Sequence, residues 1–178
     1  MTYNVLRTAL QNYEVYDETE GSERMLGTAS VDLPEIEFLT STVKGAGVAG
    51  EVDVPIAGHT SNLTTTLHWR TIHSDLTKFA APHAHMLVFR GAIQNYDTAT
   101  GRVIVSPVKI TLRGVPTKVT LGKLEPAEQT ESENEFSVDY LKVEVDGEEL
   151  IAYDKYNYTF RMNGEDYLAD TRAAVGQG

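Results

Sequence analysis

The segment NLTTTLHWRT, residues 62–71, decides how the chain folds. Its large apolar side chains occupy every second position, and polar side chains occupy most of the positions between them. Side chains of a β-strand alternate between the two faces of a sheet, so this pattern predicts a half-buried strand. The residues expected on its inward face are Leu63, Thr65, Leu67 and Trp69.

The same alternation recurs along the chain. RVIVSPVKITLRG (102–114) and SVDYLKVEVDG (137–147) both carry apolar residues at every second position. Pro107 interrupts the first of them, and because proline donates no hydrogen bond to a sheet, we expect a bulge or an edge position there. These segments predict a mainly β, antiparallel fold.

Turn signals separate the predicted strands. Asp146-Gly147 and Asn163-Gly164 are dipeptides typical of tight β-hairpins, and DTATG (97–101) joins two further alternating segments. The segment SDLTKFAAP (74–82) predicts the one short α-helix, with Ser74 as its N-cap residue and Pro82 preventing its continuation. We expect the acidic segment 125–135 to be a surface loop and the tail 170–178 to have no fold of its own.

Length and charge limit the function. The 178 residues fit one domain, residues 1–178, and no apolar run is long enough to span a membrane. With 26 acidic and 15 basic residues the formal charge is −11, and no basic run is present, so specific nucleic-acid binding is disfavoured. There is no cysteine and no signal peptide pattern, so we expect synthesis in the cytoplasm and no stable membrane association.

Three glycines raise the question of a nucleotide site. KGAGVAGEVDVP (44–55) contains the Gly45-x-Gly47-x-x-Gly50 spacing that holds a pyrophosphate in dinucleotide-binding proteins. Such a site needs a helix directly after the glycines, and the β-branched residues and proline that follow make a poor helix start. We therefore expect a tightly turning loop that lets another backbone approach closely, and no cofactor.

Two other kinds of site are suggested or tested by particular residue types, a metal site by histidines and a catalytic site by serines and carboxylates. His83 and His85 would share one strand face, an arrangement that can bind zinc or copper, although no carboxylate or thiolate accompanies them. A metal-binding β-sandwich built on these histidines remains an alternative. No nucleophilic serine motif occurs, and the paired carboxylates lie in expected turns and loops, so no catalytic residues are assigned.

Several segments, in order, resemble the major tail tube protein of contractile-tailed bacteriophages and contractile bacteriocins. They are ASVDLPEIEF, KGAGVAGEVDVPIAG, LHWRTI, VFRGAIQNYDTATGRVIVSPVKITLRGVP and SVDYLKVEVDGEELIAYDKYNYTFRMNGEDY, which together reach from about Ala29 to Val175. The chain departs from the family pattern at 12–24, where extra sequence predicts an N-terminal insertion or loop.

The resemblance implies a β-sandwich or partial barrel with one flanking helix. It also implies that six copies close into a ring with a continuous inner β-barrel, and that rings stack into a tube that sheath contraction drives through a target envelope. In a phage the tube conducts DNA without binding it specifically. The implied partners are further copies of the chain, the tail sheath, a baseplate initiator, the tape measure and the tail terminator, within a virion or bacteriocin particle. A tube or effector ring of a bacterial secretion system is the alternative.

Residues for assembly follow from the resemblance. The glycine-rich segment 44–60 is expected to act as an assembly loop, and the strand with Leu63, Thr65, Leu67 and Trp69 is expected to form part of the inner barrel. The residues expected at contacts between subunits or rings are Lys44, Gly45, Gly47, Gly50, Glu51, Gly58, Asn163, Gly164, Asp170 and Arg172.

Overall fold

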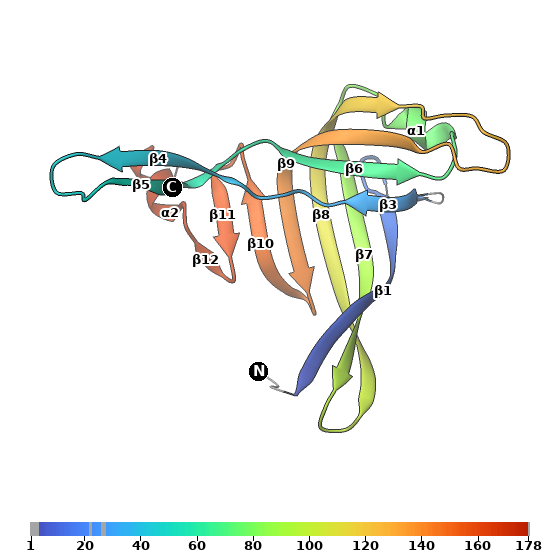
Figure 1. Cartoon of the computed structure of the whole chain (residues 1–178), viewed down its shortest axis with the longest axis horizontal. Helices are drawn as coiled ribbons and strands as arrows, with labels where there is room; N and C mark the ends of the chain where they lie inside the picture. The colour runs from blue at the N-terminus through green and yellow to red at the C-terminus, as the bar shows by residue number, and fades with distance from the viewer. Residues whose placement is uncertain (1–3, 22, 26–27, 178) are drawn as a thin grey trace.

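The computed structural model describes residues 4–21, 23–25 and 28–177. Strands dominate it, as expected for a mainly β chain (Figure 1). In chain order the elements are β1 (Val5–Asp17), β2 (Glu23–Met25), β3 (Thr28–Asp32), β4 (Phe38–Lys44), β5 (Glu51–Thr60), β6 (Leu63–Trp69), α1 (Ser74–Lys78), β7 (His85–Asp97), β8 (Arg102–Thr120), β9 (Ser132–Val145), β10 (Glu148–Asp154), β11 (Thr159–Met162), β12 (Glu165–Asp166) and α2 (Ala169–Ala174).

One strongly curved antiparallel sheet contains ten of these strands. Its main path runs β12-β11-β10-β9-β8-β7-β1-β2, and β6 joins β9 while β3 joins β6. The sheet branches at β9, because residues 132–138 pair with β6 and residues 140–145 pair with β10 along the same strand edge. The two branches fold toward each other without closing, which gives a partial barrel (Figure 1).

The core lies between these branches, where β6 turns its alternating face inward. Leu63, Leu67 and Trp69 are fully buried, as their spacing predicted. Trp69 Nε1 donates to Asn134 Oδ1 at 2.7 Å, and Asn134 Nδ2 donates to the Leu76 carbonyl at 3.2 Å. This chain of hydrogen bonds satisfies the buried polar groups and fixes α1 against β9.

The predicted turns are confirmed. Asp146-Gly147 joins β9 to β10 and Asn163-Gly164 joins β11 to β12, and both residues of each pair have positive φ, as type I′ hairpin turns require. The segment 97–101 joins β7 to β8. Pro107 pairs with β7, and pairing with β9 begins only after it, so its missing N–H lies at an open strand edge as expected.

Several sequence-based boundaries are wrong. Residues 12–17 continue β1 and residues 23–25 form β2 beside it, so 12–24 is largely strand and not one long loop. The segment 44–60 belongs to the β-hairpin of β4 and β5, in which only residues 45–50 connect the strands. Residues 132–135 of the predicted acidic loop already belong to β9, where they lie between two neighbouring strands.

The described residues form two helices, where the sequence predicted one. The tail from Asp170 contributes to α2 because Leu168, directly before it, is buried in the core and holds the helix in place. At α1 the N-cap is His73 and not Ser74, since the His73 ring accepts a hydrogen bond from the Asp75 N–H. Neither helix, nor any other in the described ranges, is long and apolar enough to cross a membrane.

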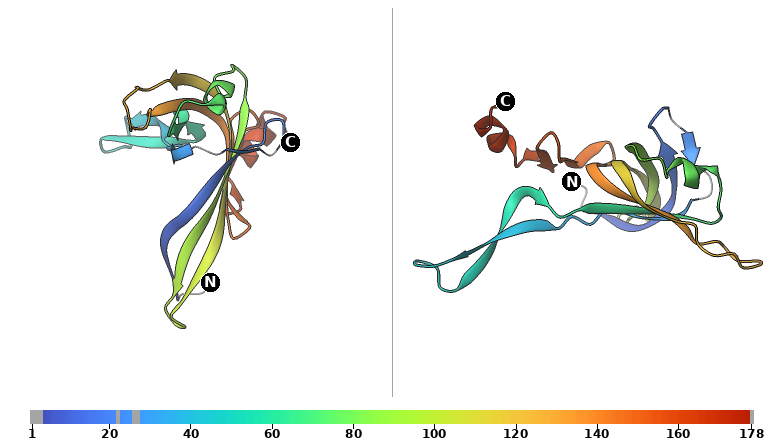
Figure 2. Two further views of the ribbon diagram at one scale, coloured as in Figure 1. Left: turned by 90° about the vertical axis from the view of Figure 1, so that its right-hand side faces the viewer. Right: turned by 90° about the horizontal axis from the view of Figure 1, so that it is seen from above.

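Three parts extend away from the body. The β4–β5 hairpin projects to the left in Figure 1, and the connection between β8 and β9 projects to the right. Below the body, the first half of β1 and the β7–β8 hairpin form a three-stranded arm (Figure 2). The hairpin and the β8–β9 connection therefore lie at opposite ends of the long axis, available to contact different neighbours.

Candidate assembly surfaces

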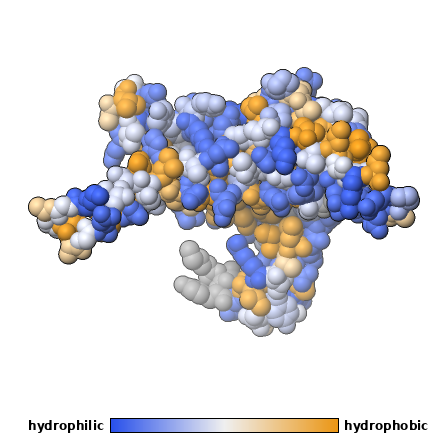
Figure 3. All heavy atoms as spheres, turned by 45° about the horizontal axis from the view of Figure 1, so that its top comes forward, coloured by the Kyte–Doolittle hydropathy of each residue, from blue (hydrophilic) through white to orange (hydrophobic). Residues whose placement is uncertain are grey.

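The β4–β5 hairpin has one apolar face that nothing in the described chain covers. Val43 lies opposite Val52, and Ser41 lies opposite Val54, so these side chains share a face. Alternation adds two more aliphatic residues to it, and each of the five aliphatic side chains is between 42 and 52% exposed. The five are Leu39, Val43, Val52, Val54 and Ile56. Figure 3 shows apolar surface on this hairpin at the left and on the arm below the body.

The opposite face of the hairpin is polar and internally paired. Thr42 Oγ1 donates to Asp53 Oδ1 at 2.7 Å, and Lys44 Nζ contacts Glu51 Oε1 at 3.3 Å across the strands. A two-stranded hairpin alone in water is only marginally stable. Its exposed valines therefore indicate a surface that a partner covers.

The glycines of segment 44–60 have two different roles. Gly45, Gly47 and Gly50 have φ values of 132°, 92° and 115°, and a Cβ on any of them would meet open space. They form the turn at the hairpin tip and leave its surface open to close approach. Gly58 differs, because a Cβ there would lie 2.4 Å from Leu168 Cδ1.

The base of the hairpin is fixed to the body. Tyr153 donates through its hydroxyl to the Gly58 carbonyl at 2.9 Å, and Phe38 packs edge-on against Phe160 with ring centroids 5.6 Å apart. Gly58 therefore makes its close contact within its own chain. The hairpin is held at this base while its tip stands free.

The C-terminal residues expected at contacts between subunits also differ from one another, because one is bonded within its own subunit and the others are exposed. Arg172 Nη2 donates to Asp166 Oδ2 at 2.6 Å and its Nη1 donates to the Tyr158 carbonyl at 2.9 Å, so this side chain fastens α2 to its own subunit. The hydrogen bond from Arg172 holds the pKa of the Asp166 carboxyl below its usual value. Asp170 and the turn Asn163-Gly164 are exposed.

The strand expected in the inner barrel belongs to a four-stranded section of sheet. Its order is β3-β6-β9-β8, formed with residues 132–138 of β9 and residues 114–120 of β8. All four residues named for this strand, Leu63, Thr65, Leu67 and Trp69, are buried and face the core. The opposite face is polar.

That polar face carries an acidic row. His68 lies between two carboxylates, with Nε2 2.9 Å from Asp32 Oδ2 and Nδ1 3.2 Å from Glu133 Oε1. Glu135 lies beside Thr66 in the same register. Hydroxyl and acidic side chains, together with His68 and Lys118, thus cover the face that is turned away from the core.

Both outer edges of this section are open. Among the described residues, β3 pairs with β6 alone, and β8 has no partner strand on its β7 side after Gly114, because Gly114 pairs with His85, the first residue of β7. Successive strands in the order β3-β6-β9-β8 are antiparallel, so the two open edges run in opposite directions. Open edges of this kind are templates for pairing with another chain.

A different sheet face holds several ion pairs. Arg113 Nε donates to Asp139 Oδ1 at 2.6 Å, and Arg161 Nε donates to Glu149 Oε1 at 2.9 Å. The hydrogen bond from Arg161 holds the pKa of the Glu149 carboxyl below its usual value. These carboxylates are already paired with cations, which is an arrangement typical of a structural surface.

The histidines considered for metal binding lie in and beside the core. The His83 and His85 ring centroids are 4.3 Å apart, but His85 is buried and packs edge-on against Phe79 and Phe136. Burial lowers the pKa of the His85 ring. Among residues 4–21, 23–25 and 28–177, no group of three or more His, Cys, Asp or Glu side chains is arranged to hold a metal ion.

Known proteins share this architecture. In an extracellular contractile injection system, the PVC sheath/tube terminator in the extended state matches with a TM-score of 0.55 and 14% identity, over 77% of this chain and 96% of that one. The sheath–tube complex of the same kind of system matches with a TM-score of 0.50 and 13% identity, over 75% and 88% of the respective chains. These two likenesses show the fold.

Sequence comparison extends the likeness to a family. The tail tube protein of Escherichia phage P2 is 26% identical over 153 residues, which cover 83% of this chain and 86% of that protein. The family model for phage tail tube protein FII matches residues 7–176. The chain therefore belongs to the phage tail tube protein FII family.

Proposed function

We propose that six copies of this chain close into a ring and that rings stack into the inner tube of a contractile phage tail or phage-tail-like particle. The chain is then a structural subunit with no catalytic role. The observation that carries the proposal is the four-stranded section β3-β6-β9-β8 with its two open, oppositely directed edges. Joining one edge to the other edge of the next copy is a head-to-tail contact, and such contacts form a ring when the rotation from copy to copy closes. The number six rests on the resemblance to the family.

The polar face of this section would line the channel. Its other face is buried against the rest of the subunit, so closure of the sheet leaves Thr66, His68, Glu133 and Glu135 facing inward. An acidic wall repels the phosphate backbone, which suits a channel that DNA passes through without being held. The formal charge of −11 supports the same reading.

The β4–β5 hairpin would make the contact between rings. It projects beyond the body along the long axis, and its apolar face is built from residues that a neighbouring ring would cover. Lys44, Glu51 and the tip glycines would lie at this contact. The exposed C-terminal positions Asn163, Gly164 and Asp170 are proposed as secondary contacts, whereas Arg172 and Gly58 act inside the subunit.

The other proposed partners belong to the same particle. They are the tail sheath around the tube, a baseplate initiator, the tape measure and the tail terminator, all assembled after synthesis in the host cytoplasm. The particle is a phage tail or a bacteriocin in this proposal, and a secretion-system tube remains the alternative. A secretion-system tube would pass protein cargo, and it would share the ring and the stacking contacts.

Negative-stain microscopy and sedimentation of the purified chain over a range of concentrations test the proposal. We expect rings at intermediate concentration and tubes at high concentration. Only monomers at the highest concentration, both alone and with a tube initiator added, would refute it.

A further inference from the structure

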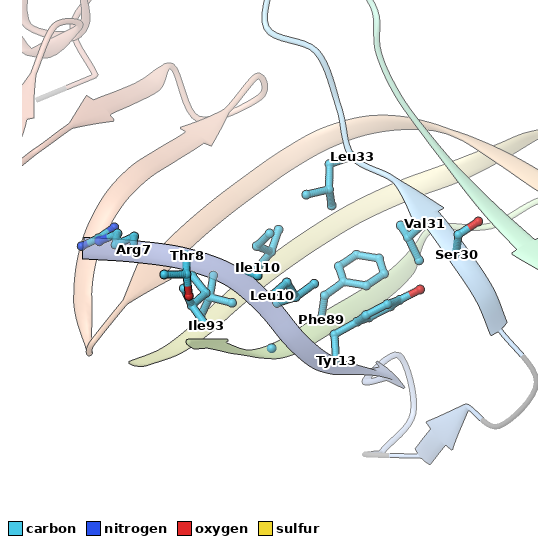
Figure 4. Close-up of a pocket in the computed structure, with 13 residues that line it drawn as sticks. Arg7, Thr8, Leu10, Tyr13, Ser30, Val31, Leu33, Phe89, Ile93 and Ile110 are labelled. Atoms are coloured by element: carbon cyan, nitrogen blue, oxygen red, sulfur yellow. The ribbon is translucent and has the colours of Figure 1, made fainter. Parts of the chain in front are cut away.

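An apolar groove lies beside the open edge of β3. Its volume is about 540 Å³, and it runs between β1, β7 and β8 on one side and β3 with the segment after it on the other. The principal apolar side chains that line it are Leu10, Tyr13, Val31, Leu33, Phe89 and Ile110. Figure 4 shows these side chains converging on one shared space from four different chain segments. Leu10 and Leu33 are about half exposed, at 53% and 50%.

The groove lies on the core side of the β3 edge. Val31, which lines it, pairs with the buried Leu67 of β6, so both side chains point to the core face of the sheet. Asp32, the next residue along, points to the opposite, polar face. A strand added to the edge of β3 would therefore direct alternate side chains into the groove.

The open edge of β8 carries apolar residues on the matching face. Val119 pairs with the buried Asn134 and so lies on the core side, yet it is 37% exposed. Leu121, the residue directly after the end of β8, is 59% exposed. Beyond Gly114 the sheet has no β7 strand that would cover them. Val119 and Leu121 are therefore exposed at the β8 edge, and the apolar groove is open at the β3 edge.

We propose that β8 of one copy pairs with β3 of the next and that its Val119 and Leu121 fill this groove. The inference rests on the proposed ring and names the contact that closes it. Consecutive antiparallel pairing places β8 antiparallel to the neighbouring β3 and keeps the core faces on one side. Residues 115–120 and the strand Thr28–Asp32 are also similar in length.

Charge on the polar face agrees with this pairing. Lys118 pairs with Glu135 in the register, which places it on the polar side, and it makes no ion pair within the described chain. On the β3 edge, Asp32 presents a carboxylate that is 73% exposed and contacts only His68 through one oxygen. Pairing of the two edges brings Lys118 of one copy close to the Asp32 carboxylate of the next.

Cross-linking tests the contact directly, because the chain has no cysteine. We would combine Val119→Cys with Leu33→Cys and treat the assembled protein with a short bis-maleimide. We expect a ladder of covalent oligomers that ends at the ring. A mixture of the two single-cysteine variants should give dimers and no larger species, because each copy then offers only one end of the contact.

The matched control pairs Val119→Cys with Tyr156→Cys, which lies in the exposed turn between β10 and β11. We expect at least tenfold less cross-linking in this control at equal degrees of assembly. Rings or tubes in the microscope with cross-linking no stronger than the control would overturn the groove contact and leave the proposed function standing. Absence of any oligomer in either variant and in the unmodified chain would refute the proposed function, and this inference with it.

Discussion

Replacing two valines of the hairpin by threonine should weaken tube growth without unfolding the subunit. Val52 and Val54 lie on the exposed apolar face of β5, next to Val43 across the strands. Threonine has nearly the same shape and keeps the preference for strands, but it places a hydroxyl where valine has a methyl group. Val52→Thr/Val54→Thr therefore changes the polarity of the face and little else.

The expected size follows from the exposed fractions of the two side chains. Val52 is 52% exposed and Val54 is 46% exposed, so about half of each remains in water until a neighbour covers it. Burying a whole valine side chain contributes about 1.5–3 kcal/mol, and burying the exposed half contributes about 0.8–1.5 kcal/mol. Losing most of this at both positions costs about 1.5–3 kcal/mol per subunit, which raises the critical concentration for tube growth by roughly 10- to 100-fold.

Sedimentation of tubes over a dilution series measures this critical concentration, with microscopy as a check on tube length. Thr42→Val on the polar face is the matched control, because it exchanges a hydroxyl for a methyl group, the reverse of the test substitutions, on the other face of the same hairpin. It should leave the critical concentration within a few-fold of the unmodified chain. A critical concentration for Val52→Thr/Val54→Thr that equals that of the unmodified chain would refute the assignment of this face to the contact between rings.

Three further predictions concern single positions. Gly47→Val should leave the subunit folded and shorten the tubes, because φ of 92° strains a β-branched residue at the hairpin tip; unchanged tube length and yield would contradict this. Gly58→Ala should destabilise the subunit by about 2 kcal/mol, seen as a lower thermal midpoint, since its Cβ meets the buried Leu168; Gly47→Ala, in open space, should cost less. For Asp17, burial raises the pKa but hydrogen bonds from Lys78 and Thr19 outweigh it, so the pKa lies below its usual value. The stability it contributes is present above about pH 4 and lost as pH falls through the lowered pKa, and Lys78→Met should flatten that loss in acid unfolding curves.

The sequence predicted correctly those parts of the fold in which a residue pattern and the surroundings of the same residues agree. Leu63, Leu67 and Trp69 alternate along a strand that is paired on both sides, so period and burial agree. Asp146-Gly147 and Asn163-Gly164 need only their own backbone conformation to form a turn. Neither prediction depended on a distant segment.

The parts that the sequence did not predict depend on contacts far along the chain. β1 and β2 form because residues 12–17 pair with β7, some 70 residues away. No local pattern in 12–24 indicates this pairing. The helix α2 forms because Leu168 enters the core below Gly58. The open edges of β3 and β8 become visible only when the register of the whole sheet is known.

The hairpin of β4 and β5 was missed for a different reason, and that reason supports its role in assembly. Alternation is present in FLTSTVK and EVDVPI, which is the pattern of strands with one buried face, but the glycines between them favoured a loop. In the folded subunit all seven residues of β4 are exposed, and apart from the contact of Phe38 with Phe160 the described chain does not provide the buried environment that the pattern requires. The alternation is that of a half-buried strand, but its own chain leaves the strand uncovered. The pattern and the structure agree if another copy of the chain covers the apolar face.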